Sequence, residues 1–476
     1  MGKFALKIHL FSAALLATAA FPALAADPVT TPEDQTGLTL TVYQQNIALV
    51  REQRRIDLPD GRSRLAVVGV PSALMPETVL ASGATANRIR VLGQVYESAL
   101  LTPEALLRAA VGGTVQVVTT HPETGTESFA AADVLRAKGR EALLRLDGRI
   151  RTMDVRRIAF DRAPSNLRAR PTLVLDIASA GAGPDDLTLS YLTGGLNWKT
   201  DYVARLSEDE KTIRLAGWVT LTNGTETVFE EARLRVVAGT INRASRPARP
   251  RVAMKAMRAE ASRAADMPAS SAVSDLRVFD FPETVTIRAK EKRQLALLTA
   301  AAVKVEKHYR LDGNNSYYGS LRRGIQRNSP TVRYRLENKA DTGLGRALPS
   351  GTVRLYVPSK GGDLLRGEDR IRYTPVGEKL TLTMGLAADI TSERRQTDFR
   401  RDGLPKNVVE TAHRIVLRNA KTEAVTVDLI EHIPGDWRML EESQPHRKRT
   451  SAQAEWIISV PAGGEAELTY RVRTRF

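Results

Sequence analysis

The sequence predicts an all-β fold: multi-domain antiparallel β-sandwich modules, a small SH3-like barrel and one long basic linker or loop. Apolar and polar residues alternate at period two in many short runs, as at residues 38–43 and 332–336, which is typical of strands with one buried face. Turn residues such as Pro59-Asp60-Gly61 separate the runs. A length of 476 residues favours roughly three domains, each large enough to bury a core.

The composition excludes several kinds of chemistry. The chain has no cysteine, so disulfides, thiol nucleophiles and cysteine-ligated metal sites are ruled out. With 26% charged and 42% hydrophobic residues, it is a globular chain and not a disordered one. Its formal charge is +16, and residues 243–330 alone carry +10. We therefore expect an acidic partner. We also expect no cofactor.

The first 25 residues read as an export signal. Lys3 and Lys7 precede an apolar stretch at 8–21, and Ala23-Leu24-Ala25 fits the small-residue cleavage pattern before Ala26. A retained membrane anchor would need about 20 apolar residues, and this stretch is shorter. We expect a Sec-type signal peptide at 1–25, a periplasmic or secreted mature protein, and no transmembrane segment after cleavage.

Two modules are predicted in the first part of the mature chain. Residues 26–100 form an N-terminal β-strand region. Residues 101–165 begin with a short helix, for which Thr102 is the N-cap and Pro103 the first helical residue. Five short strands follow at regular spacing, which favours a small SH3-like β-barrel.

The second part of the chain is predicted to contain larger β modules. Residues 166–242 form a central β-sheet domain that continues at 275–330, and residues 331–476 form a C-terminal β-sandwich. The intervening segment 243–274 holds seven basic and two acidic residues, three prolines and no aromatic residue. This composition indicates a linker or long loop.

No catalytic or metal motif is present in the sequence. It has no Gly-x-Ser-x-Gly elbow, no His-Glu-x-x-His and no phosphate-binding Gly-x-x-x-x-Gly-Lys-Ser/Thr loop. The six histidines are far apart, and none has a ligand at metal spacing. His432, beside Glu431, is best interpreted as a solvated or packing histidine. We expect no catalytic residue and no metal site.

One cluster of aromatic and acidic residues is a candidate ligand site. Asn197, Trp198, Asp201 and Tyr202 lie close together after a Gly-Gly pair, as on a carbohydrate-stacking surface. The alternative is that the tryptophan fills a sandwich core and the aspartate lies at a turn.

The basic segment is the second candidate site. Its candidate contacts for an anionic partner are Arg246, Arg249, Arg251, Lys255 and Arg258. Envelope polysaccharide, anionic lipid headgroups and another envelope protein are the candidate partners. Nucleic acid is not expected, because the protein is exported and no aromatic side chain is available there for base stacking. The alternative for this segment is a flexible linker without a binding role.

Four phrases resemble a known bacterial family. They are Tyr-Leu-Thr-Gly-Gly-Leu-Asn-Trp-Lys-Thr-Asp-Tyr at 191–202, and the stretches at 217–223, 367–378 and 431–437. The chain is similar to the family of "domain of unknown function four-one-three-nine", which includes the mucoidy-inhibitor-A-like proteins. This resemblance implies a secreted, mostly β architecture and supplies no catalytic residue. The coiled-coil insert of some members is missing, because residues 84–165 show no heptad run.

These observations lead to one functional hypothesis and one alternative. We expect an exported, soluble, β-rich protein that serves as a non-enzymatic binding or scaffold module of the bacterial cell envelope. The alternative is a glycan-active hydrolase, or a carbohydrate-binding protein, with Asp201 among its functional carboxylates.

Overall fold

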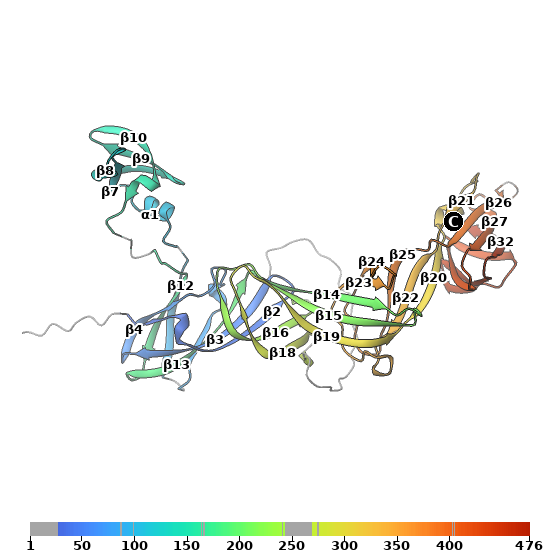
Figure 1. Ribbon diagram of the computed structural model, residues 1–476, viewed down its shortest axis with the longest axis horizontal. Coiled ribbons are helices and arrows are strands. Elements are labelled where there is room, and N and C mark those ends of the chain that lie inside the picture. Colours follow the sequence, from blue (N-terminus) through green and yellow to red (C-terminus); the bar gives the residue numbers. More distant parts are fainter. Residues whose placement is uncertain are drawn as a thin grey trace, which may run out of the picture. The chain divides into compact units, whose positions relative to one another are not determined.

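The structure is a computed structural model that describes residues 27–85, 88–98, 100–162, 164, 167–239, 241–242, 269–273, 276–401, 403 and 405–476. Strands make up 64% of it and helices 5%, so the all-β prediction is confirmed (Figure 1). The chain divides into two units, and each is discontinuous in sequence. The first holds residues 1–35, 54–70 and 81–188, and the second holds 36–53, 71–80 and 189–476.

The first unit contains two complete sheets, the α-helix and parts of strands that belong to a third sheet. One is a four-stranded sheet in the order β1-β4-β12-β6, in which β1 is parallel to β4. Its strands are β1 (Val29–Thr30), β4 (Gly61–Val68), β6 (Ile89–Glu97) and β12 (Thr172–Ser179). The helix, α1 (Pro103–Ala109), begins where the sequence predicted, because the Thr102 hydroxyl accepts a hydrogen bond of 3.1 Å from the Ala105 amide.

The second sheet of this unit corresponds to the predicted SH3-like module. Its strands are β7 (Thr114–Thr120), β8 (Glu127–Lys138), β9 (Glu141–Leu146), β10 (Arg149–Asp154) and β11 (Ile158–Ala159). The order is β10-β9-β8-β7-β11, with β10 and β11 at opposite edges. Leu107 of α1 packs into the core of this sheet with Val117, Val134 and Leu144. Five strands are confirmed, while closure into an SH3-like barrel stays a prediction.

Four further sets of strands build the rest of the chain. A seven-stranded sheet has the order β17-β18-β16-β2-β3-β13-β5, and a five-stranded sheet has the order β19-β15-β14-β23-β24. The former contains β2 (Gln35–Tyr43), β3 (Ile47–Leu58), β5 (Leu80–Gly83), β13 (Gly183–Gly194), β16 (Phe229–Ala238), β17 (Ala269–Val273) and β18 (Leu276–Ile287). The latter contains β14 (Leu196–Leu206), β15 (Thr212–Asn223), β19 (Lys292–Lys304), β23 (Gly351–Val357) and β24 (Leu364–Ile371).

Two sheets at the C-terminal end of the chain form a sandwich. One has the order β25-β22-β20-β28-β31-β30 and the other β21-β26-β27-β32-β29. The six-stranded sheet contains β20 (Glu306–Asp312), β22 (Thr331–Glu337), β25 (Lys379–Leu386), β28 (Val425–His432), β30 (Arg447–Thr450) and β31 (Gln453–Val460). The five-stranded sheet contains β21 (Gln326–Asn328), β26 (Ile390–Arg400), β27 (Val408–Asn419), β29 (Asp436–Glu442) and β32 (Glu465–Arg475).

The inner faces of these two sheets share one core. Trp456 on β31 stacks on Tyr470 of β32, with 5.0 Å between the ring centroids. Leu429 and Val472 are fully buried beside them. Because strand side chains alternate between faces, the other face of the six-stranded sheet is turned away from this core, and it carries the site described next.

Short 3-10 helices occur at Pro32–Asp34, Pro76–Thr78, Val155–Arg157, Asn315–Tyr317 and Ala340–Thr342. Within the described ranges, no helix has the length and apolar character needed to cross a membrane. The predicted signal peptide, residues 1–25, and residues 243–268 of the predicted basic linker lie outside those ranges. Residues 269–273, at the end of that predicted linker, form β17 and pair with β18, so the linker prediction was wrong there. The domain boundaries drawn from the sequence stay a prediction.

Candidate anion-binding groove

The outer face of the six-stranded sheet gathers basic side chains by strand alternation. On β22, Val332, Tyr334 and Leu336 point into the core, so Arg333 and Arg335 point outward. The neighbouring strand β20 is in register with β22, with Glu306 opposite Arg335.

Two more strands extend the same face. The outward residue Arg310 of β20 lies beside Asp428 of the parallel strand β28, and Asp428 lies opposite Ile457 of β31. At the sheet edge, Arg447 of β30 lies opposite Glu455 of β31. Side chains from segments more than 100 residues apart therefore meet on one surface.

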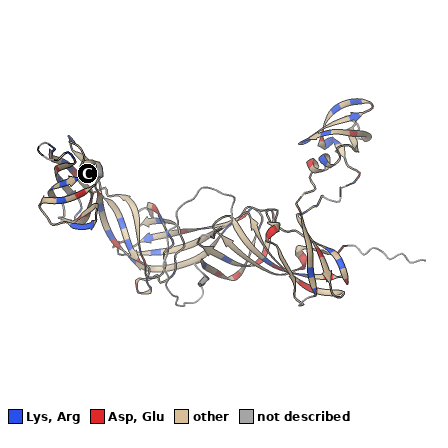
Figure 2. Cartoon of the chain, turned by 180° about the vertical axis from the view of Figure 1, so that it is seen from behind, with Lys and Arg blue, Asp and Glu red and all other residues tan. Residues whose placement is uncertain are grey.

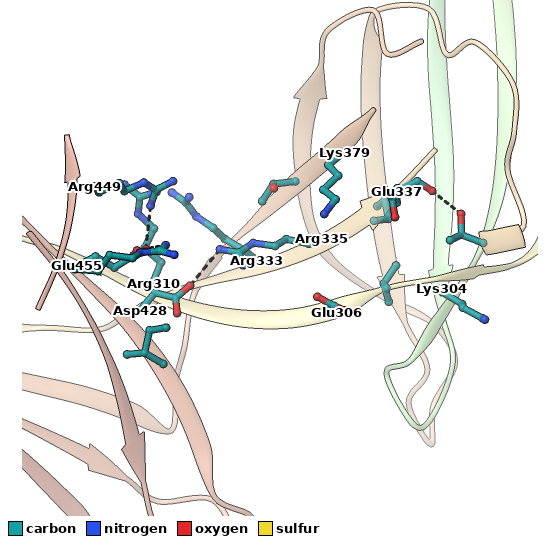
Figure 3. A pocket seen from close by; sticks show the side chains of 16 residues that line it. Lys304, Glu306, Arg310, Arg333, Arg335, Glu337, Lys379, Asp428, Arg449 and Glu455 are labelled. Atoms are coloured by element: carbon teal, nitrogen blue, oxygen red, sulfur yellow. Dashed lines mark hydrogen bonds and ion pairs between the residues drawn. The ribbon is translucent and has the colours of Figure 1, made fainter. Parts of the chain in front are cut away.

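These side chains line a groove of about 830 Å³ (Figure 3). Its seven basic residues are Lys304, Arg310, Arg333, Arg335, Lys379, Arg447 and Arg449, and its four acidic residues are Glu306, Glu337, Asp428 and Glu455. Lys and Arg occur on strands throughout the chain (Figure 2), but here they converge on one hollow. The excess of positive charge makes the groove attractive to anions.

Most of the arginines are held in place by carboxylates. Arg335 donates a hydrogen bond of 3.1 Å to Asp428, and Arg449 donates one of 3.2 Å to Glu455. Arg310 donates from Nε to both carboxylate oxygens of Asp312, at 2.9 Å each. These pairs fix the guanidinium groups without using all of their N–H donors.

Arg333 is different from its neighbours. Its nearest carboxylate oxygen, on Asp312, lies 4.0 Å from Nη2, and its buried Nε has no hydrogen-bond partner among the described residues. Burial lowers the pKa of Arg333, and the positive charges of Arg310, Arg335 and Arg449 add to this effect. A buried N–H donor without a partner is costly, so an acceptor supplied by a ligand would stabilise this side chain.

The geometry suits the binding of carboxylate, sulfate or phosphate groups. A guanidinium group presents a planar fork of donors that matches two oxygens of such an anion. None of the described residues that line the groove is aromatic, so the groove offers no platform on which nucleic-acid bases would stack.

The sequence-predicted aromatic site is divided between two faces of β14. Trp198 and Tyr202 are buried and donate hydrogen bonds to the carbonyls of Val237 and Pro349, at 3.2 and 2.8 Å. Burial raises the pKa of Tyr202. Both aromatic side chains therefore fill the core, as the alternative expected for the tryptophan. The same alternative was wrong about Asp201, which lies within β14 and not at a turn.

The polar members of that site point to the opposite face. Asn197 is exposed, and Asp201 is mostly buried against Lys199 at 3.0 Å and Arg354 at 3.2 Å. Burial raises the pKa of Asp201, but hydrogen bonds from these two cations outweigh it and lower the pKa overall. A general acid needs a raised pKa, so this environment does not favour that role for Asp201.

The structure does not test the predicted contacts in the basic segment. Arg246, Arg249, Arg251, Lys255 and Arg258 fall outside the residues that the structure describes. A role for them stays a prediction. The groove was not identified from the sequence. A signal was present, because Arg333 and Arg335, like Arg447 and Arg449, are two residues apart and therefore lie on one face of a strand.

A buried polar cluster lies between the two C-terminal sheets. Glu431 forms an ion pair with Arg394 and accepts a hydrogen bond of 2.7 Å from Tyr318, whose hydroxyl lies 2.8 Å from that of Tyr470. His413 packs against both tyrosine rings. We call these five residues the Arg394–Glu431 cluster.

Burial and charge set the ionisation of this cluster. Burial lowers the pKa of His413 to about 3, and the nearby Arg394 charge contributes. Burial also opposes the charge of Arg394, but Glu431 outweighs it, and the pKa of Arg394 is raised. The cluster thus holds one buried ion pair and a neutral histidine.

His432 takes no part in this cluster. Its Nε2 lies 3.6 Å from Asp312, and its Nδ1 lies 3.2 Å from the side chain of Gln453. Across the part of the chain that the structure describes, no group of three or more His, Asp or Glu side chains is placed to hold a metal ion.

Residues 187–476 match the model of a family described as "Domain of unknown function (DUF4139)". This protein belongs to the DUF4139 family. The DUF4139 match covers more than half of the chain and includes every residue of the groove and of the buried cluster. The family resemblance read from the sequence is therefore confirmed. No curated protein matches this DUF4139 chain.

Proposed function

We propose that this DUF4139 protein is a non-enzymatic binding module of the cell envelope that holds a linear acidic polysaccharide on the outer face of the six-stranded sheet. One observation carries the proposal: several guanidinium groups converge on a groove of about 830 Å³, and one of them, Arg333, has a buried Nε that finds no partner in the described part of the chain.

The arrangement of charge favours a polymer over a single headgroup. On the outer face of β22, Arg333 and Arg335 are two residues apart, which places their side chains about 7 Å from one another along the strand. A row of this kind contacts successive anionic groups of an extended chain. A single lipid headgroup would use only one end of it.

The location outside the cytoplasm rests on the sequence alone. The basic start, apolar stretch and Ala-x-Ala site at 23–25 support export. Cell fractionation with mass spectrometry of the purified protein tests this part. The expected result is an N-terminus at Ala26 in the periplasmic or secreted fraction. A cytoplasmic protein that keeps residues 1–25 would contradict it.

The proposal assigns no catalytic residue. Two of the four carboxylates in the groove are engaged by arginines: Asp428 is paired with Arg335, and Glu455 is paired with Arg447 and Arg449. Glycoside hydrolysis needs two carboxyl groups that both face the scissile bond, and these two carboxylates are occupied by arginines.

Binding of polygalacturonate oligosaccharides, measured by isothermal titration calorimetry, tests the ligand class. The substitution Arg333→Gln removes the guanidinium donor that lacks a partner. Every carboxylate of the groove keeps its ion pair in this variant. The expected loss is at least tenfold in affinity, because a charge-assisted hydrogen bond contributes about 1.5–3 kcal/mol. The triple variant Arg333→Gln/Arg335→Gln/Arg449→Gln should lose binding almost entirely.

A matched variant separates the groove from net charge. Arg136→Gln/Arg149→Gln/Arg151→Gln removes the same three charges from exposed positions on β8 and β10, and it should bind as the wild type does. Circular dichroism confirms that each variant is folded. Equal losses in the two triple variants would show that overall charge, and not the groove, attracts the polymer.

A further inference from the structure

A second cavity adjoins the groove and has different chemistry. Its volume is about 730 Å³, and it lies between β20, β21 and β26. Its charged residues are Arg310, Arg327, Asp312 and Glu393, two of each sign. The cavity is therefore close to neutral, whereas the groove beside it carries an excess of positive charge. We call it the hydroxyl cleft.

Two ion pairs line the hydroxyl cleft. Arg310 donates to both oxygens of Asp312, and Arg327 donates a hydrogen bond of 2.9 Å to Glu393. Each pair presents unused N–H donors next to unused carboxylate lone pairs. A sugar hydroxyl donates one hydrogen bond and accepts others, so it matches such a pair better than an anion does.

Neutral polar groups line the rest of the hydroxyl cleft. The side chains of Asn328 and Thr391 are exposed and have no hydrogen-bond partner within the described chain. Ser329 and Thr331 also reach the cavity, and Leu386, which is 63% exposed, supplies an apolar surface. A neutral sugar ring offers the same combination of hydroxyl groups and C–H faces.

The hydroxyl cleft and the groove adjoin each other at one residue. Arg310 lines both cavities. Along β22, Thr331 belongs to the hydroxyl cleft, and Arg333, Arg335 and Glu337 belong to the groove. Together, the hydroxyl cleft and the groove follow β22 for roughly 20 Å. An extended polymer lying on it would meet hydroxyl-binding groups at one end and then the guanidinium groups of Arg333 and Arg335.

We infer that the hydroxyl cleft is a subsite for an uncharged sugar residue, and that the ligand is a heteropolysaccharide containing both acidic and neutral units. This inference rests on the proposed function, because the arginine groove supplies the contact with the acidic units. It adds a specificity that the groove alone does not have, namely preference for a mixed polymer over one made of acidic units only.

Three probes of equal length test the subsite: hyaluronan oligosaccharides, which alternate acidic and neutral units, polygalacturonate oligosaccharides, which are acidic throughout, and neutral dextran oligosaccharides. The cleft variant Asn328→Ala/Thr391→Ala alters exposed side chains only. It should weaken hyaluronan binding about tenfold, since two neutral hydrogen bonds are lost, and leave polygalacturonate binding unchanged.

The control and the outcomes distinguish this inference from the proposed function. Thr152→Ala/Asn407→Ala makes the same changes at exposed positions outside both cavities and should bind all probes as the wild type does. If the cleft variant binds hyaluronan as tightly as the wild type, the subsite is overturned and the groove stands. If Arg333→Gln leaves both acidic probes bound, or if the wild type binds neither, the proposed function and the subsite both fail.

Discussion

The Tyr318 hydroxyl donates a hydrogen bond of 2.7 Å to the Glu431 carboxylate, and both side chains are fully buried in the C-terminal sandwich. Arg394 completes the interaction from β26 of the facing sheet. Because Glu431 lies on β28, next to the strand that carries Arg310, this core contact helps to fix the sheet whose outer face forms the groove.

Removing one partner of the buried pair should destabilise the sandwich strongly. Arg394→Met leaves the Glu431 carboxylate buried without a cation, at an expected cost of about 3–5 kcal/mol. The double variant Arg394→Met/Glu431→Met removes both charges and should lose much less stability. Native-state hydrogen exchange of the β27 and β28 amides measures the local free energy of opening. A single variant that loses less than the double variant would contradict this account.

Gly313 should tolerate no side chain. A Cβ atom at this position would overlap with Glu431 Oε2, so Gly313→Ala forces the carboxylate away from Arg394 and Tyr318. The expected effect is a loss of about 3 kcal/mol in the stability of the same amides. Gly319→Ala is a control, since a Cβ there meets no atom within 4 Å. Similar effects of the two substitutions would argue against a tight cluster.

His413 should make the sandwich less stable as the pH falls. The unfolded chain takes up a proton at this residue near pH 6.5, but in the folded protein burial lowers the pKa of His413 to about 3. Since the unfolded state binds more protons within this window, stability decreases from about pH 6.5 towards pH 3, by about 1 kcal/mol per pH unit.

The variant His413→Phe tests this assignment. It keeps an aromatic ring beside Tyr318 and Tyr470 and removes the titrating group. Chemical denaturation at pH 7 and pH 5 should show a smaller difference in stability for the variant than for the wild type. An unchanged difference would mean that the pH dependence comes from other groups.

Tyr202 should matter for stability and not for binding. Its hydroxyl is buried and donates to the Pro349 carbonyl at 2.8 Å, so Tyr202→Phe leaves that carbonyl without its partner and costs about 1–2 kcal/mol. Polygalacturonate affinity at a temperature where the variant is folded should be unchanged. A clear loss of affinity would restore the aromatic segment at 197–202 as a ligand site.

The sequence predicted the strands and their faces well, because alternation is a local property. In the segment 332–336 it separated the buried residues from Arg333 and Arg335. It did not predict the groove, because Arg310 and Asp428 come together only through the parallel pairing of β20 with β28. Long-range strand pairing of this kind leaves no local pattern.

The candidate site at 197–202 was predicted from residues that are close in sequence but do not lie on one face. Asn197, Trp198, Asp201 and Tyr202 are close in sequence, yet neighbouring residues of a strand point to opposite faces. A count of positions within β14 separates the two aromatic residues from the two polar ones. The sequence already contained this information, once the segment is taken as a strand and not as a turn.

Salt should weaken binding in the groove more than in the hydroxyl cleft. The groove contacts involve partly exposed charges, as the 43% exposure of the Arg335 side chain shows, and dissolved ions screen such charges. Raising NaCl from about 0.05 to about 0.5 M should reduce polygalacturonate affinity by at least tenfold. Hyaluronan should lose less, since its neutral units are not screened. Equal losses would contradict a separate neutral subsite.

Arginine-specific labelling with phenylglyoxal, followed by mass spectrometry, tests the central claim most directly. The protein is labelled alone and with saturating polygalacturonate oligosaccharide. Our account predicts that the ligand protects Arg333, Arg335 and Arg449 and leaves the labelling of Arg149 and Arg151 unchanged. Equal labelling of the groove arginines with and without ligand would contradict the proposal that this face binds an acidic polysaccharide.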